Sequence, residues 1–234
     1  MAVRVELRDV SVAYPNGVQA LTDITISFLE GDFAFLVGPT GHGKSTFLRL
    51  LYREEVPTTG QVFVSGWDVP RLSAPRVPYL RRKIGVVFQE FRLLPQRTAA
   101  ENIAFALHAC GAPPHTVAAR VKESLERVDL ADRATHFPSQ LSAGEQQRLA
   151  IARALAPGPS LVLADEPTGN LDPQSSANVS ALLQEANQQG ATVIVATHDP
   201  AIVDAAQRRV VALYRGRVVS DVPKGKYPDD VGPQ

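Results

Sequence analysis

A glycine-rich stretch that ends in a lysine and two hydroxyl residues could bind the phosphates of a nucleotide. Glycines let the backbone turn its N–H groups inward around a β-phosphate. Lys44 can reach the β- and γ-phosphates, and the Ser45 hydroxyl can bind Mg²⁺. The stretch fits G-x-x-x-x-G-K-[ST] and lies between an apolar run and a helical pattern, as this motif requires. The predicted phosphate loop comprises Gly38, Pro39, Thr40, Gly41, His42, Gly43, Lys44, Ser45 and Thr46.

The residue at position 42 is unusual, because a small residue is commoner at this variable position of the motif. We expect the His42 imidazole to face solvent, although its backbone belongs to the predicted loop.

Two adjacent carboxylates and a histidine follow two other apolar runs. Asp165 and Glu166 come directly after residues 161–164, and His198 follows residues 192–196 closely. Ligands bind at the ends of such strands. We therefore expect Asp165 to hold Mg²⁺ through its water shell and Glu166 to act as general base on a water molecule. A lone histidine there is more often structural, but beside the two acids His198 is predicted to sense a γ-phosphate.

A turn of small residues, Ser142-Ala143-Gly144, opens the helical stretch LSAGEQQRLAIARAL at residues 141–155. A turn of this kind at a helix N-terminus can receive an anion. The Ser142 hydroxyl and the Gly144 N–H are donors, yet they do not make a complete nucleotide site. The chain therefore carries two elements that could bind phosphate.

Apolar runs and amphipathic patterns place these motifs in an α/β fold. Residues 3–10 and 22–28 alternate between apolar and polar, which predicts half-buried antiparallel strands. Residues 33–37, 84–88, 161–164 and 192–196 are continuously apolar, as in a parallel sheet buried on both faces. Between about 89 and 157 the pattern is helical, with one helix starting at Pro113-Pro114. The Pro- and Gly-rich tail, 222–234, is expected to be loosely ordered.

Composition argues against several classes of function. The 234 residues include 24 Lys and Arg and 24 Asp and Glu, so no net positive charge favours nucleic acid or an anionic membrane surface. The single cysteine, Cys110, cannot form an internal disulfide, which fits a reducing compartment. We expect neither a signal peptide nor a membrane span, because no apolar run is long enough. A role at a membrane would need a partner.

Taken together, the motifs resemble those of the ABC ATPase superfamily. Its Q-loop, signature, D-loop and H-loop correspond to Gln89, LSAGEQQR, GNLD and His198, and the main departure is Ala143 in place of glycine. The resemblance, over about residues 3–220, implies a single ABC nucleotide-binding domain spanning 1–234. Its P-loop NTPase (RecA-like) core with a parallel sheet would span about 1–88 and 158–221. An N-terminal antiparallel β lobe, a helical subdomain at about 89–157 and a tail from about 222 would complete it.

The same resemblance implies how the ligands are held. ATP and Mg²⁺ are the expected cofactors, and Tyr14 would stack on the adenine, although a lone tyrosine there could equally be packing. Ser142 and Gly144 would contact the γ-phosphate of ATP on a second copy, so a head-to-tail homodimer would complete two equivalent sites. The implied catalytic set is Lys44, Gln89, Glu166 and His198, and the implied metal set is Ser45, Gln89 and Asp165.

Within the superfamily, FQEFRLLPQRTAAENIAFAL and LLYREEVPTTGQVFVSGWDV resemble the branch that acts in bacterial cell division, with Glu90 where aspartate is usual. Lipoprotein-releasing and macrolide-efflux ATPases share DEPTGNLD and are the alternative. The resemblance implies an integral membrane partner, attachment to the cytoplasmic face of the membrane, and control of cell-wall hydrolases. We expect the partner to dock at Phe91, Leu93 and Leu94, although these side chains could instead pack the subdomain joint.

Two other classes fit the sequence less well. DNA-associated ATPases with the same motifs separate them by long coiled coils, whereas Lys44 and Ser142 are fewer than 100 residues apart and no heptads intervene. A nucleotide switch without hydrolysis would lack the general base, and Glu166 is present. The sequence therefore predicts a motor that hydrolyses ATP.

Overall fold

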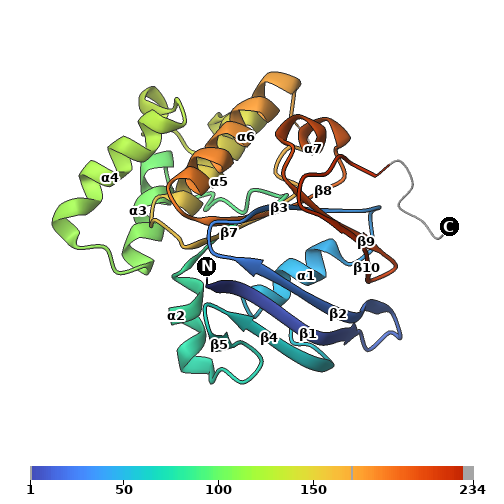
Figure 1. Ribbon diagram of the computed structural model, residues 1–234. Helices are drawn as coiled ribbons and strands as arrows, with labels where there is room; N and C mark the ends of the chain where they lie inside the picture. Colours follow the sequence, from blue (N-terminus) through green and yellow to red (C-terminus); the bar gives the residue numbers. More distant parts are fainter. Residues whose placement is uncertain (1, 170, 229–234) are drawn as a thin grey trace.

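Two β-sheets, with one helix between them and others stacked on the outside, form the structure (Figure 1). The computed structural model describes residues 2–169 and 171–228. The strands are β1 Val3–Ala13, β2 Gln19–Leu29, β3 Phe33–Val37, β4 Thr59–Val64, β5 Trp67–Asp68, β6 Ile84–Val87, β7 Leu161–Asp165, β8 Thr192–Thr197, β9 Arg209–Tyr214 and β10 Arg217–Val222. The helices are α1 Lys44–Leu51, α2 Val77–Arg81, α3 Ala99–Ala109, α4 Pro114–Arg127, α5 Ala143–Leu155, α6 Pro173–Gln188 and α7 Pro200–Ala206.

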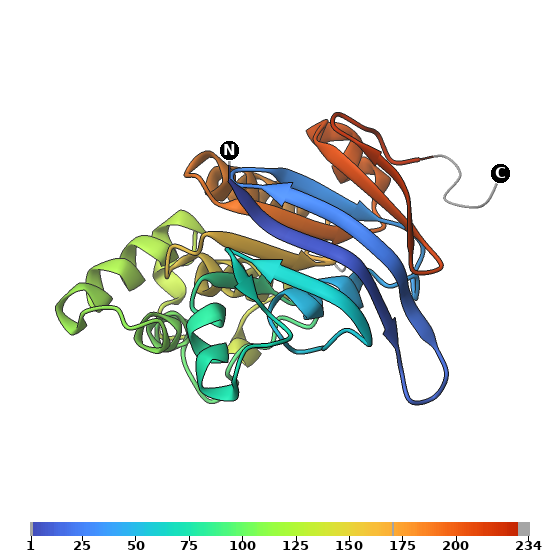
Figure 2. The ribbon, with the colours of Figure 1, turned by 60° about the horizontal axis from the view of Figure 1, so that its bottom comes forward.

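The smaller sheet is antiparallel, in the order β2-β1-β4-β5. The prediction of antiparallel strands at 3–10 and 22–28 is confirmed, since β1 and β2 pair in this way over their whole length. Figure 2 brings this sheet forward and shows β4 beside β1. Alternate residues of β1, such as Val5 and Leu7, are fully buried, which is why the strand alternates in sequence.

The larger sheet has the order β10-β9-β3-β8-β7-β6, in which all neighbours are parallel except β9 and β10. The four continuously apolar runs of the sequence become β3, β6, β7 and β8, as predicted. Every residue of β3 and β8 is buried, because helices or the other sheet cover both faces. The carboxyl ends of β3, β6, β7 and β8 therefore lie together along one edge of the sheet.

The larger sheet divides the hydrophobic core into two layers. Phe47 and Leu50 of α1 pack between the two sheets with Phe28 of β2 and Leu36 of β3. On the other face of the large sheet, α5 and α6 bury side chains such as Leu149 and Val179. Figure 1 shows α1 below the large sheet and α5, α6 and α7 above it. The phosphate loop thus connects β3 of the larger sheet to α1, the helix that lies between the two sheets.

The predicted helical region contains α3, α4 and α5, which pack on one another. Figure 1 shows α3 and α4 at one end of the molecule and α5 beside α6. Helix α4 begins at Pro114, as predicted, and α3 begins with a capping box formed by Thr98 and Glu101. Asn102 of α3 is fully buried, and its amide bonds the backbone of Leu94 and Arg97. This contact fixes the loop that follows β6.

Part of the predicted tail packs against the domain instead of extending into solvent. The N–H of Gly225 donates to the carbonyl of Arg208, and the N–H of Tyr227 donates to Asp204 Oδ1 at 2.7 Å. A Cβ atom at Gly225 would lie 3.0 Å from the Val210 side chain, so the glycine allows a close approach to β9. Residues 222–228 are therefore ordered by specific contacts, and residues 229–234 lie outside the described part.

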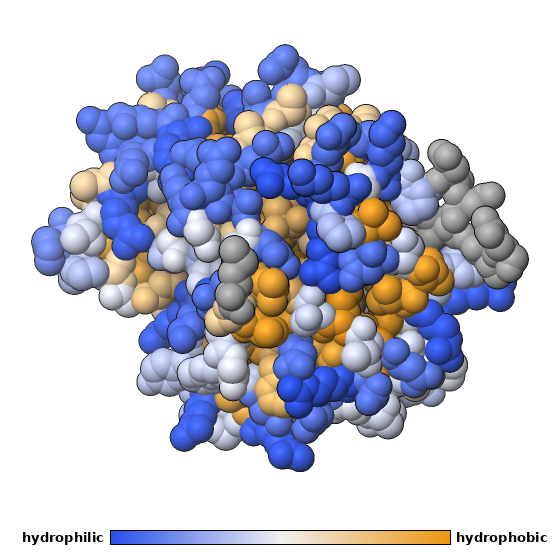
Figure 3. Space-filling view, in the orientation of Figure 1, coloured by the Kyte–Doolittle hydropathy of each residue, from blue (hydrophilic) through white to orange (hydrophobic). Residues whose placement is uncertain are grey.

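Several exposed apolar side chains belong to the strands of the two sheets. Val3, Leu29, Val219 and Val222 are each exposed by more than a third of their surface. In the space-filling view, hydrophobic residues collect over the strands, while hydrophilic residues cover most of the helical part (Figure 3). Among residues 2–169 and 171–228, no helix has both the length and the apolar character needed to cross a membrane.

Candidate functional site

The loop between β3 and α1 has the geometry of an anion site. Gly38, Gly41 and Gly43 have φ angles of 144°, 82° and 101°. Residues with a Cβ atom rarely adopt this backbone conformation. At Gly38 a Cβ atom would lie 2.1 Å from the carbonyl oxygen of Leu213, so only glycine fits. Helix α1 begins at Lys44, and no described side chain caps its N-terminus. Its first N–H groups are therefore free to bind a negatively charged group.

Lys44 lies inside this loop and is only 6% exposed. Its ammonium group donates to the carbonyl of Gly38 at 2.6 Å and to that of Pro39 at 3.2 Å. Nζ also lies 3.6 Å from Glu166 Oε1. The buried cation is thus held at the centre of the loop by neutral carbonyls, where a phosphate oxygen could replace one of them.

A pocket of about 410 Å³ opens above the loop and collects most of the predicted residues. Gly38, Pro39 and His42 do not line it, and neither do Ser142 and Gly144 among the described residues. The predicted residues that do line it are Tyr14, Thr40, Gly41, Gly43, Lys44, Ser45, Thr46, Gln89, Glu166 and His198.

The predicted metal ligands meet in a smaller, adjoining hollow of about 140 Å³, which Ser45, Gln89 and Asp165 line together. Burial raises the pKa of the Asp165 carboxyl above its ordinary value; the bond from Ser45 opposes this, and the Glu166 charge adds to it. Asp165 Oδ1 is buried without a hydrogen-bond partner among the described residues. An unsatisfied carboxylate oxygen beside a hydroxyl and an amide suits a hard cation such as Mg²⁺, which prefers oxygen ligands.

At this hollow and elsewhere, the described residues, 2–169 and 171–228, contain no cluster of three or more His, Cys, Asp or Glu that could hold a metal. A cation at the hollow would therefore depend on nucleotide phosphates and water for its remaining ligands.

Glu166 and His198 form a close pair at the ends of β7 and β8. Glu166 Oε1 lies 2.8 Å from His198 Nδ1, and Oε2 accepts the His198 N–H at 3.3 Å. The Glu166 backbone has φ 46°, a left-handed conformation, and its N–H donates to the carbonyl of Ala196 at 2.8 Å. This turn separates the Glu166 carboxylate from that of Asp165. The geometry can position a water molecule and accept its proton.

The outer end of the pocket is formed by the turn between β1 and β2. The hydroxyl groups of Tyr14 and Thr46 are 3.0 Å apart, so the phenol reaches the end of the phosphate loop. Tyr14 is half-buried, and it both packs on the core and lines the pocket. Val18 and Ala20 line the same end. Sequence reasoning missed Val18, although its place in the same turn as Tyr14 was a signal.

The signature residues lie outside this pocket, at the start of α5. Ser142 caps the helix: its Oγ accepts the Glu145 N–H, and Glu145 Oε2 accepts the Ser142 N–H at 2.8 Å. These bonds and Arg133 lower the pKa of Glu145, the backbone bond to Ser142 contributing most. A Cβ atom at Gly144 would lie 3.0 Å from Ser175 Oγ. Of the GNLD segment, Asn170 lies outside the described residues.

Tyr227 is a further side chain near the site. The sequence analysis placed this residue in the loosely ordered tail. Burial raises the pKa of Tyr227, the Glu166 carboxylate raises it further, and the backbone of Gly38 lowers it. The phenol is therefore close to both the general-base candidate and the phosphate loop. No pattern in the sequence connects this tyrosine with residues so far away along the chain.

A parallel sheet with a glycine loop, a buried lysine and two acids at its carboxyl edge defines a P-loop nucleoside triphosphatase. The family model for ABC transporters matches residues 21–169, and the chain belongs to this ABC transporter family. It is an ATPase: it binds and hydrolyses ATP.

The similarity to known proteins extends over nearly the whole chain. The cell division ATP-binding protein FtsE of Bacillus subtilis (strain 168) is 48% identical over 223 residues, which are 95% of this chain and 98% of that protein. FtsE of Mycobacterium tuberculosis is 50% identical over 211 residues, which are 90% of this chain and 92% of that protein. The solved dimeric ATP-binding cassette MJ0796, bound to ADP and Pi, is 35% identical with a TM-score of 0.88, covering 95% of this chain and 100% of that one.

Proposed function

We propose that this chain is the ATPase subunit of a cell-division complex of the FtsEX type. It works on the cytoplasmic face of the plasma membrane, bound to the integral membrane protein FtsX. ATP-driven closure of its homodimer acts through FtsX to regulate cell-wall hydrolysis at the septum. The observation that carries this proposal is the 44–50% identity to proteins named FtsE over at least 90% of the chain.

In the proposed site the phosphate loop and Lys44 bind the ATP phosphates, and Tyr14 faces the adenine. Ser45, Gln89 and Asp165 hold Mg²⁺, which supplies positive charge at the phosphate oxygens. The orphaned Asp165 Oδ1 and its raised pKa support this assignment, because both indicate a carboxylate that gains from a cation.

Glu166 is the proposed general base. Its carboxylate is 10% exposed and lies 3.6 Å from Lys44 Nζ, so it faces the place where a γ-phosphate would lie. His198 contacts both Glu166 oxygens and keeps the carboxylate turned towards the pocket. From that position Glu166 can accept a proton from an attacking water, and His198 can report the presence of the γ-phosphate.

The second phosphate element, Ser142 and Gly144, is proposed to complete the site of another copy. One observation supports a composite site: Ser142 and Gly144 lie outside the pocket of their own chain, at the N-terminus of α5. The solved relative MJ0796 is dimeric with ADP and Pi bound. In a two-fold dimer each chain would supply its phosphate loop to one site and its signature to the other.

A groove of about 480 Å³ is the proposed docking site for FtsX. It lies where the helical region meets the core, and its apolar walls include Phe88, Leu94 and Phe105, the last being 51% exposed. Of the three apolar residues predicted for docking, only Leu94 lines the groove. Phe91 and Leu93 are half-buried, and Leu93 packs on the core, so the packing interpretation applies to that side chain.

Co-purification with FtsX tests both the partner and the groove. Phe105→Glu and Leu94→Glu should lose most of the bound FtsX from detergent extracts, while the purified variants still hydrolyse ATP. Phe137→Glu is the matched control, because Phe137 is also exposed in the helical region but does not line the groove. If a permease of a lipoprotein-releasing or macrolide-efflux system co-purified in place of FtsX, the cell-division assignment would be wrong.

A further inference from the structure

The His42 side chain packs against the turn between β9 and β10. The residue is half-buried, so the expectation of a solvent-facing imidazole is wrong. Its ring meets that of Tyr214 edge-on, with centroids 4.9 Å apart. Its Nδ1 accepts a hydrogen bond from the N–H of Arg215 at 3.2 Å, which places the ring proton on Nε2. His42 does not line the nucleotide pocket, so these contacts hold the phosphate loop from outside.

The turn that receives His42 is itself firmly fixed. Arg215 and Gly216 have φ angles of 47° and 74°, as in the two-residue hairpin turns with two positive φ angles. The carbonyl of Gly216 accepts the Thr22 N–H of β2 at 2.8 Å. A Cβ atom on Gly216 would lie 2.6 Å from the carbonyl oxygen of Ala20. The turn therefore packs closely against β2, which restricts its movement.

The rest of the loop touches the same framework through its backbone. A Cβ atom at Gly38 would lie 2.1 Å from the carbonyl oxygen of Leu213 in β9, and one at Gly43 would lie 2.5 Å from that of Ala20. These close backbone contacts limit how the loop can move, but they are not hydrogen bonds. His42, between the two glycines, adds the directed polar contact and an aromatic contact.

We propose that His42 is a positioning residue that fastens the phosphate loop to the β9–β10 turn and thereby sets the affinity for ATP. A loop already held in its binding shape loses less conformational freedom when ATP binds. The contact lies away from the reacting atoms, so it acts on nucleotide affinity and leaves the chemical step alone. A small residue at position 42 could not reach Tyr214 or Arg215. The contact therefore needs a longer side chain at this position.

Three substitutions separate the two contacts. His42→Ala removes both, His42→Phe keeps the aromatic contact without the acceptor, and His42→Asn offers Oδ1 as an acceptor near the position of Nδ1. Affinity is measured on the purified full chain as the Kd of a fluorescent ATP analogue, and KM and kcat for ATP are measured in parallel. Losing one hydrogen bond corresponds to a change of about 2- to 10-fold. We expect Kd and KM to rise by that factor in the Ala and Phe variants, to be largely restored in the Asn variant, and kcat to stay within about twofold.

The control is His115→Ala, which removes an exposed histidine at the start of α4, far from the loop in the fold. It should leave Kd, KM and kcat unchanged. Tyr214→Leu probes the contact from the other side, and in combination with His42→Ala its effect on Kd should be less than additive. An unchanged Kd in His42→Ala, a fall in kcat at constant KM, or additive effects with Tyr214→Leu would overturn the proposal. If His42→Ala does not fold, His42→Phe decides, because it keeps the aromatic contact and lacks the acceptor: a wild-type Kd in that variant would overturn the proposal.

Discussion

Glu166 is the one carboxylate among the described residues that line the nucleotide pocket. Its contacts with His198 and Lys44 place it between a residue that can report the γ-phosphate and one that can bind it. If Glu166 is the base, Glu166→Gln should bind ATP normally and hydrolyse it about 10²–10⁴ times more slowly, because an amide cannot accept the proton of water. Single-turnover hydrolysis and ATP-analogue binding measure the two effects separately.

Lys44→Ala is the contrasting variant, since it should lose affinity for ATP itself. Near-normal turnover by Glu166→Gln would assign the base to another group, and His198 would be the first to test.

Asp165→Asn should increase the free energy of unfolding of the nucleotide-free protein at neutral pH, although it should impair hydrolysis. Burial holds the pKa of folded Asp165 above its unfolded value, about 3.9. A raised pKa contributes stability that is fully present below the unfolded pKa and is lost as the pH rises through the folded pKa. At neutral pH the ionised, buried carboxylate therefore costs stability, which the neutral amide avoids.

Urea unfolding at about pH 7 and about pH 3 measures this effect. The gain should shrink at the lower pH, where the wild-type carboxyl is protonated in both states. A gain of the same size at both values would mean that packing, and not charge, is responsible.

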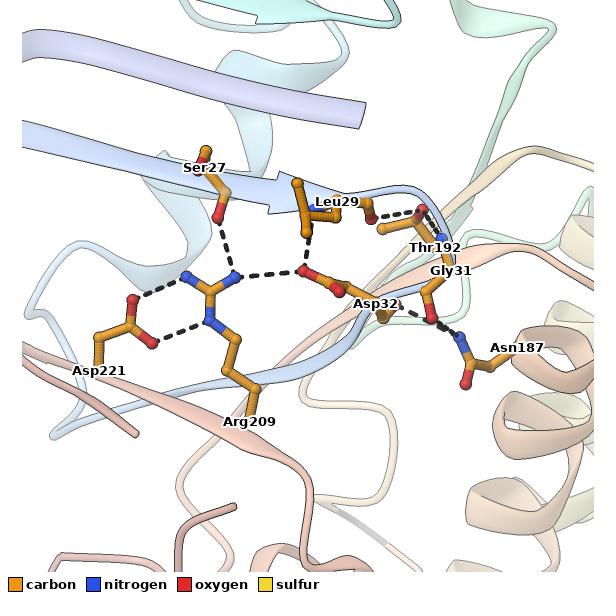
Figure 4. A network of polar contacts seen from close by, with 8 residues as sticks. All are labelled: Ser27, Leu29, Gly31, Asp32, Asn187, Thr192, Arg209 and Asp221. Carbon is orange, nitrogen blue, oxygen red and sulfur yellow. Dashed lines mark hydrogen bonds and ion pairs between the residues drawn. The ribbon is translucent and has the colours of Figure 1, made fainter. Parts of the chain in front are cut away.

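At the scale of elements, one polar network joins three strands at the edge of the sheet opposite the site. Arg209, at the start of β9, makes two hydrogen bonds with Asp221 of β10, one with the carbonyl of Ser27 in β2, and an ion pair with Asp32 (Figure 4). Beside it, Asn187 of α6 donates to the carbonyl of Gly31. The network ties the antiparallel sheet to the larger one away from the nucleotide.

Removing the centre of this network should destabilise the protein without changing its chemistry. Arg209→Met keeps much of the side-chain volume and should cost about 1.5–3 kcal/mol, the range for hydrogen bonds to charged groups. Chemical denaturation measures the loss, and KM for ATP should stay at its wild-type value. Arg217→Ala is the control: its ion pair with Asp23 is more than half exposed on both sides, so about 0–1 kcal/mol is expected. Equal losses would refute a special role for Arg209.

The elements show what sequence patterns can reveal. Strands buried on both faces, such as β3 and β8, are recognisable because every residue is apolar. The antiparallel strand β10 is not, because it lies at a sheet edge and is mostly exposed. The prediction also omitted β9, although its apolar residues 210–213 carry the same signal as β3.

At the site, the motifs predicted which side chains the strand ends bring together, and the structure places ten of them around one pocket. The contact of His42 with Arg215 could not be predicted, since 173 positions separate the two residues and no local pattern connects them. The placement of Tyr227 near Glu166 was hidden for the same reason: it depends on how the segment after β10 folds back.

At the scale of the whole molecule, the two phosphate elements predict an assembly that depends on nucleotide. With ATP and Mg²⁺, Glu166→Gln should form a dimer of about twice the 25.2 kDa chain mass, because the slow variant keeps ATP between the two copies. Adding Ser142→Arg to that variant should prevent dimer formation, since the larger side chain would occupy the place of the γ-phosphate. ATP should still bind the phosphate loop of the single chain.

Light scattering with and without ATP distinguishes the two variants. Equal dimer populations would contradict a site shared between chains, whatever their rates of hydrolysis.

The left-handed backbone at Glu166 has a consequence for how this protein can change over time. A residue other than glycine costs about 1–2 kcal/mol in that conformation, and glycine would relieve the cost while removing the carboxylate. That substitution would also remove the contacts of the carboxylate with Lys44 and His198, so the relief of the backbone is offset by the loss of these contacts. If Glu166 is the base, selection for activity keeps an acid in a backbone conformation that suits glycine better.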